Sequence, residues 1–171
     1  CDLATVKAKA AELGYSTTST KKSVLNYVAD PVTLDDKADC QNATNVVIPF
    51  STLQTVNFKY DETSQTYIRY ARNKLQTDAT TETNITKNII ITKVDNYTLN
   101  DGSGKGRQDI KNIGTKEGYY ITNGKAIPIT CTKDSRGSQT VYKDAEGNEI
   151  NVNDGNTFIE ICPTNAQITI E

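Results

Sequence analysis

Apolar side chains recur at every second position in short segments beyond residue 45, and polar turn residues separate these segments. In 54–60 the apolar positions are Val56, Phe58 and Tyr60, and polar residues stand between them. Successive side chains of a strand point to opposite faces, so a period of two predicts half-buried strands. We therefore predict that 54–60 and 66–71 form a β-hairpin and that most of the chain folds into a sheet.

Other segments extend the same pattern. Asn123 and Gly124 lie between two apolar runs in 118–133, and this pair suits a type I′ turn because both central positions need positive φ. A further hairpin is predicted over 139–152. The β-branched run at 88–92 predicts a central strand. Strands are also expected at 46–50, 156–163 and 167–171.

The first 44 residues have a different character. Residues 2–13 predict a helix, because apolar side chains recur at spacings of three and four between Leu3 and Leu13, and Asp2 and Gly14 suit its two caps. Residues 23–29 fit a strand and a short helix equally well. We predict an α+β fold of mainly antiparallel sheet, a meander of hairpins, with residues 1–44 as a helical and irregular segment of the same unit as the β-rich domain 45–171.

Composition supports strands and turns and argues against several functions. The 25 Thr and 16 Asn residues favour strands and turns respectively. Net charge is −2 without a run of five like charges, which argues against nucleic-acid binding. The sequence contains no stretch of 18 apolar residues, so no membrane-spanning helix is predicted. Because the chain starts with Cys and contains no Met, we expect a processed or excised form.

Histidine is absent, and this limits the chemistry of the four cysteines. No pair of cysteines has CxxC spacing, so we expect no zinc site and no other metal or cofactor. A cysteine nucleophile would lack its usual base, and we expect no catalytic residue. Cys131 and Cys162 both fall in predicted strands, where they are either joined by a disulfide or buried as small apolar side chains.

Residues 96–109, which carry three glycines in five positions, are predicted to be a loop, and 101–107 is its glycine-rich part. Gly102 and Gly104 allow backbone amides to converge on an anion, and Lys105 and Arg107 add positive charge. The alternative is a surface loop without a ligand.

Four blocks, at 56–70, 88–91, 106–133 and 142–163, together resemble the C-terminal domain of the YerB-type bacterial lipoproteins. The resemblance covers residues 45–171. It implies a protein of mostly Gram-positive bacteria, outside the cytoplasm and lipid-anchored to the outer face of the cell membrane, with a second domain N-terminal to this one. No biochemical role follows from it.

The resemblance also points to a site. Tyr67, Arg69 and Asp78 match a Y-x-R…D motif of the family, and Lys133 is expected on the same face. These four residues are predicted either to bind a ligand or, for Arg69 and Asp78, to form a structural ion pair.

Two functions fit these observations. The first is a non-catalytic module that binds its sister N-terminal domain, a protein partner or a cell-wall component, with the membrane reached only through the lipid anchor. The second is an envelope enzyme with most catalytic residues in the N-terminal domain, its site completed by Arg69 or Lys133.

Overall fold

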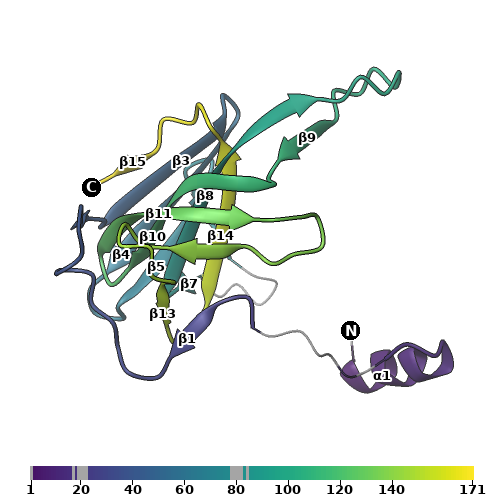
Figure 1. Ribbon diagram of the computed structural model, residues 1–171, viewed down its shortest axis with the longest axis horizontal. Coiled ribbons are helices and arrows are strands. Elements are labelled where there is room, and N and C mark those ends of the chain that lie inside the picture. The colour runs from purple at the N-terminus through teal and green to yellow at the C-terminus, as the bar shows by residue number, and fades with distance from the viewer. Residues whose placement is uncertain (1, 17, 19–22, 78–82, 84) are drawn as a thin grey trace.

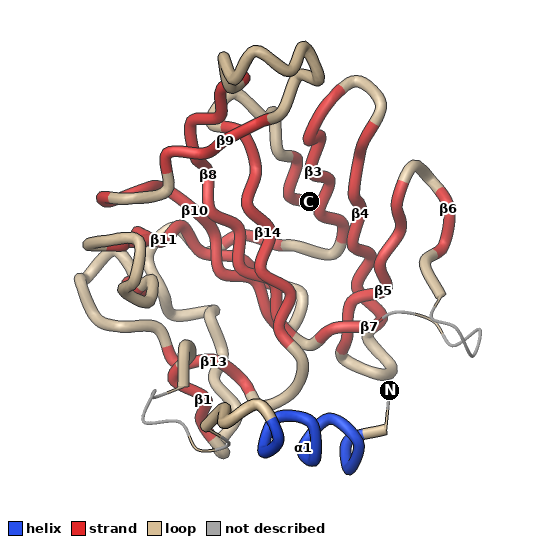
Figure 2. Tube along the Cα trace, turned by 90° about the vertical axis from the view of Figure 1, so that its right-hand side faces the viewer, coloured by secondary structure: helices blue, strands red, loops and turns tan. Residues whose placement is uncertain are grey.

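The computed structural model describes residues 2–16, 18, 23–77, 83 and 85–171. Two layers of β-sheet make up the body, with β3 to β6 in one layer and β8, β10, β11 and β14 in the other (Figure 2). The helix α1 (Leu3–Glu12) precedes both layers. The prediction of a mainly antiparallel β fold with a short N-terminal helix is confirmed.

One layer is a six-stranded sheet in which the meander β3-β4-β5-β6 follows chain order. The predicted hairpin of residues 54–71 is formed by β4 and β5, with Tyr60 opposite Tyr67. The strands of this sheet are β3 (Asn45–Ser51), β4 (Gln54–Asp61), β5 (Thr66–Ala71), β6 (Lys74–Leu75), β7 (Ile85–Thr86) and β15 (Thr169–Ile170).

The other layer is a seven-stranded sheet whose main path runs β12-β11-β10-β8-β14. Its strands are β2 (Gln41–Asn42), β8 (Asn88–Thr98), β9 (Gln108–Lys111), β10 (Gly114–Thr122), β11 (Lys125–Lys133), β12 (Val141–Lys143) and β14 (Thr157–Pro163). The turn between β10 and β11 places Asn123 at φ 50° and Gly124 at φ 73°, as the type I′ prediction requires. Beyond the body, β8 and β9 continue as a two-stranded arm (Figure 1).

Among the strands that the structure describes, two pairings are parallel, which the sequence pattern did not predict. Strand β14 lies parallel to β8, and β1 (Asn26–Val28) lies parallel to β13 (Asn151–Asn153). Residues 23–29, which fit two structures equally well in sequence, thus contribute a strand. Parallel strands need long connections, so neither pairing leaves a local signature.

Strand β8 separates two hydrophobic cores. Ile89 and Ile91 point into the core between the sheets, whereas Ile90 points into a second core on the outer face of the seven-stranded sheet. Leu25 and Leu34 cover that outer face together with Tyr142. A strand buried on both faces is apolar at consecutive positions, which explains the isoleucine run.

Candidate functional site

Arg69 lies between the two sheets and pairs with Glu160 of β14. Its Nε and Nη2 atoms each donate to Glu160 Oε1 at 3.4 Å. The guanidinium carbon lies 4.8 Å from the ring centre of Phe158 and 5.8 Å from that of Phe58. Burial raises the pKa of the Glu160 carboxyl, and the nearby Arg69 offsets only part of that shift. Arg69 is therefore engaged in joining the sheets, and Asp78 lies outside the described residues.

Tyr67 is fully buried, and its hydroxyl group is used within the fold. The hydroxyl donates to the Ala43 carbonyl and accepts from the Gly124 amide, both at 3.0 Å. Its ring packs against Tyr60, with ring centres 5.0 Å apart. The Asn123–Gly124 turn of one sheet is thereby attached to the other sheet, and burial raises the pKa of the phenol. Tyr67 and Arg69 share a strand face, as predicted, but that face is the interior.

Lys133 lies far from Arg69. Arg69 contacts Glu160 of β14. Across the seven-stranded sheet, Glu160 pairs with Ile91 of β8, Ile91 with Tyr119 of β10, and Tyr119 with Pro128 of β11. Lys133 is five positions further along β11, so the two sites are separated by about 16 Å along the strand and about 14 Å across it. Its ammonium group donates to the Ser138 carbonyl. A shared site of Arg69 and Lys133 is not what the structure shows.

The glycine-rich segment 101–107 forms the exposed tip of the β8–β9 arm (Figure 1). Gly102 and Gly104 have positive φ, at 71° and 63°. Arg107 forms an ion pair with Asp101 within the same loop, at 3.1 Å. The Asp101 carboxylate therefore neutralises the Arg107 charge that was predicted to attract an anion. Lys105 stays exposed. The anion-binding role stays a prediction.

Of the two alternatives for Cys131 and Cys162, the structure shows the second, because both are free and buried. Two strands lie between β11 and β14, a separation of about 14 Å, whereas disulfides need Cα atoms within about 7 Å. The two thiols also belong to different cores. Burial raises the pKa of both thiols, to about 11 for Cys162, so they pack as apolar side chains rather than as thiolates.

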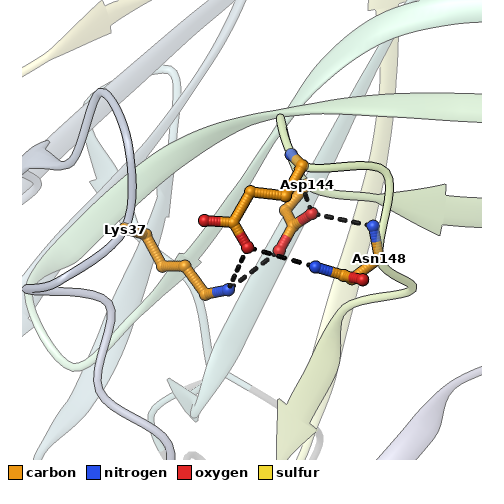
Figure 3. Close-up of polar contacts among 4 residues, drawn as sticks. Lys37, Asp144 and Asn148 are labelled. Carbon is orange, nitrogen blue, oxygen red and sulfur yellow. Dashed lines mark hydrogen bonds and ion pairs between the residues drawn. The ribbon is translucent and has the colours of Figure 1, made fainter.

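A cluster that sequence reasoning missed lies around Asp144 (Figure 3). Asp144 Oδ1 accepts from the backbone amides of Glu146 and Asn148, at 3.1 and 2.9 Å, and Oδ2 accepts from Lys37 Nζ at 2.9 Å. Lys37 also lies 3.5 Å from Glu146 Oε2. Burial alone would raise the pKa of Asp144, but these donors outweigh it and lower the pKa. The cluster holds the turn after β12 against the segment that covers the second core.

The Asp144 turn forms part of the wall of two cavities. One, which we call the sheet groove, has a volume of about 290 Å³ and crosses β8, β10 and β11. Its lining includes Tyr119, Pro128 and Ala145, with Lys93 and Glu117. The other, of about 260 Å³, lies on the opposite face between Lys37 and the turn. Predominantly apolar walls with a few charged side chains make the sheet groove the candidate binding site.

The hairpin predicted over 139–152 contains this turn, which the Lys143–Glu149 bridge closes, but the contact of the turn with Lys37 was not predicted. Lys37 precedes Asp144 by 107 positions and lies in an irregular polar stretch. The Arg69–Glu160 pair likewise spans 91 positions. No spacing rule links such residues, so only the folded topology reveals them.

Among the described residues, no helix has the length and apolar character needed to cross a membrane. The part of the chain that the structure covers also contains no group of three or more His, Cys, Asp or Glu side chains arranged to hold a metal ion.

Comparison with known proteins gives a consistent assignment. Residues 46–159 match the family model described as "Protein of unknown function (DUF3048) C-terminal domain". The crystal structure of YerB from Bacillus subtilis superimposes with a TM-score of 0.73 at 20% identity, over 96% of this chain and 52% of that one. The chain thus spans about half the length of YerB. No curated protein matches.

Proposed function

This chain belongs to the DUF3048 C-terminal domain family, a family of unknown function, and from this premise we propose that it is a non-catalytic binding module of an extracytoplasmic bacterial lipoprotein. The module binds a protein, either its own N-terminal domain or another envelope component. Its location on the outer face of the cell membrane is part of the same proposal.

One observation carries the proposal: Tyr67, Arg69 and Lys133, the members of the predicted site that the structure describes, are engaged in contacts within the fold. Tyr67 bonds to Ala43 and Gly124, Arg69 to Glu160, and Lys133 to Ser138. A catalytic group needs a free lone pair or proton facing a substrate. The sheet groove, in contrast, presents mainly apolar surface, to which Tyr119 and Pro128 contribute.

The chemistry of the sheet groove suits an apolar segment of a protein. Tyr119 and Pro128 provide apolar surface, and tyrosine is enriched at protein interfaces because it combines a large ring with a polar tip. Lys93 and Glu117 lie at the same groove with opposite charges, which can orient a bound peptide segment.

Site-specific photo-crosslinking tests this proposal. A benzoylphenylalanine replaces Tyr119 in the groove or, as a matched control, the exposed Tyr27 of β1, and each protein is incubated with envelope membranes. We expect a discrete crosslinked protein from position 119 that excess unlabelled domain displaces. Equal crosslinking at both positions, or none at 119, would contradict the proposal.

The proposed location has its own test. Protease added to intact cells of the host should degrade the protein when it lies on the outer face of the membrane, while a cytoplasmic marker survives. Survival of both proteins would refute that location and leave the groove experiment unaffected.

A further inference from the structure

Helix α1 presents an apolar stripe that nothing among the described residues covers. Leu3, Val6 and Leu13, at the helix and its C-cap, are 65%, 47% and 53% exposed, and the helix contains no buried side chain. At 3.6 residues per turn these three side chains fall within about 80° of the helix circumference. Ala8 lies on the opposite side. The three side chains thus share one face of the helix, and α1 itself lies apart from the two sheets (Figure 1).

The ends of α1 are well formed. The Asp2 carboxylate accepts from the amides of Ala4 and Thr5, at 3.2 and 3.0 Å, as an N-cap. After the helix, Gly14 has φ 69° and Tyr15 donates to the Ala10 carbonyl. Even with both caps, a helix of ten residues is marginal in water, and most helical stability in proteins comes from packing of an apolar face.

The position of α1 in the chain indicates what covers it. The family is described as a C-terminal domain, so the remaining part of its proteins lies on the N-terminal side, and α1 precedes the matched residues 46–159. The match to YerB leaves about 4% of the 171 residues unaligned, or about seven, fewer than the ten of α1. The span matched to YerB therefore includes part of α1. The other half of the YerB chain lies outside this match.

We propose that the stripe of Leu3, Val6 and Leu13 packs against the N-terminal domain of the YerB-type protein and attaches that domain to this one. This inference rests on the proposed function, because it names the surface that contacts the sister domain. The sheet groove then stays available for a second partner.

Hydrogen exchange of the α1 amides measures this contact. Peptides covering 3–12 are followed by mass spectrometry in the isolated chain and in the intact two-domain protein. We expect at least tenfold slower exchange in the intact protein. Val6→Glu and Leu13→Glu should abolish the difference, whereas Ala8→Glu, which adds the same charge on the opposite side, should preserve it.

Three results would overturn the inference. The first is equal exchange of α1 in both proteins. In the second, protection arises in the isolated chain only as its concentration rises, so that a second copy is the occupant. In the third, protection appears only with phosphatidylglycerol vesicles, which would identify a lipid surface. Crosslinking from position 119 is measured on the isolated chain, so it can succeed while this inference fails.

Discussion

Arg69 on β5 and Glu160 on β14 form an ion pair across the two sheets, with their side chains only 15% and 10% exposed. The rings of Phe58 and Phe158 lie 5.8 and 4.8 Å from the guanidinium carbon of Arg69 and cover part of it. Removing two charges from water costs free energy, and an attraction at 3.4 Å recovers only part of that cost. Each of the two buried charges therefore needs its partner, and loss of either one leaves the other buried without a counter-charge.

Replacement of Arg69 alone should be much more harmful than replacement of both residues. Arg69→Met leaves the Glu160 carboxyl buried without a partner, and we expect a loss of about 3 kcal/mol in the free energy of unfolding. The double variant Arg69→Met/Glu160→Leu should recover most of this loss. Urea denaturation measures both, with the exposed Lys74→Met as control. A double variant no more stable than the single one would show that the pair does not behave as a unit.

Glu160 should give the fold a stability that falls as pH rises. Burial raises its pKa above the ordinary value of 4.5, so the folded state holds the proton at pH values where the unfolded state has lost it. Its contribution is fully present below pH 4.5 and declines as pH rises through the folded pKa. The unfolding free energy of the native protein minus that of Glu160→Gln should therefore decrease as pH rises from 4 to 7. A shift of opposite sign would contradict the raised pKa.

Asp144 should show the reverse dependence. Its pKa is lowered below the ordinary 3.8, so its contribution is present above that pH and is lost as pH falls through the folded pKa. Replacement by Ala leaves the amides of Glu146 and Asn148 without their acceptor, at a cost of about 1–3 kcal/mol near neutral pH. Thermal unfolding should show this gap shrinking in acid. Lys37→Met should reproduce only part of the loss, because the backbone amides of Glu146 and Asn148 still donate hydrogen bonds to Asp144.

Gly118 should not tolerate a side chain. A Cβ atom there would overlap the Ile91 carbonyl oxygen of the neighbouring strand and lie 2.9 Å from Cys131 Sγ. We expect Gly118→Ala to cost about 3 kcal/mol, because backbone on β8 cannot move aside without breaking its ladder. Gly137→Ala is the matched control, since no atom lies within 4 Å of its Cβ position. Equal melting temperatures of the two variants would refute this account.

The parts of the fold that the sequence predicted are those with local causes. The β4–β5 hairpin follows from alternating side chains around a short turn, and the β10–β11 turn follows from Asn123 and Gly124, whose φ values are positive. Helix α1 follows from its spacing and caps. Each of these signals involves residues only a few positions apart.

The candidate site was less predictable, because its contacts connect distant segments. The Y-x-R pattern correctly placed Tyr67 and Arg69 on one face, but the same alternation fits an exposed face and an interior one. Which applies depends on β14, whose Glu160 reaches Arg69 only after the second sheet has formed. The sheet groove, likewise, exists only because the Asp144 turn folds beside β10 and β11.

The parallel pairing of β1 with β13 has a kinetic consequence. Asn26 meets Asn151 across 125 positions of chain, so all the residues between them must be synthesised before this ladder can close. Closing so long a loop costs entropy before any contact is gained, and proteins dominated by such pairings fold in milliseconds to seconds rather than microseconds. During that interval the outer face of the seven-stranded sheet lacks its cover, and the chain is then most exposed to aggregation and to proteases.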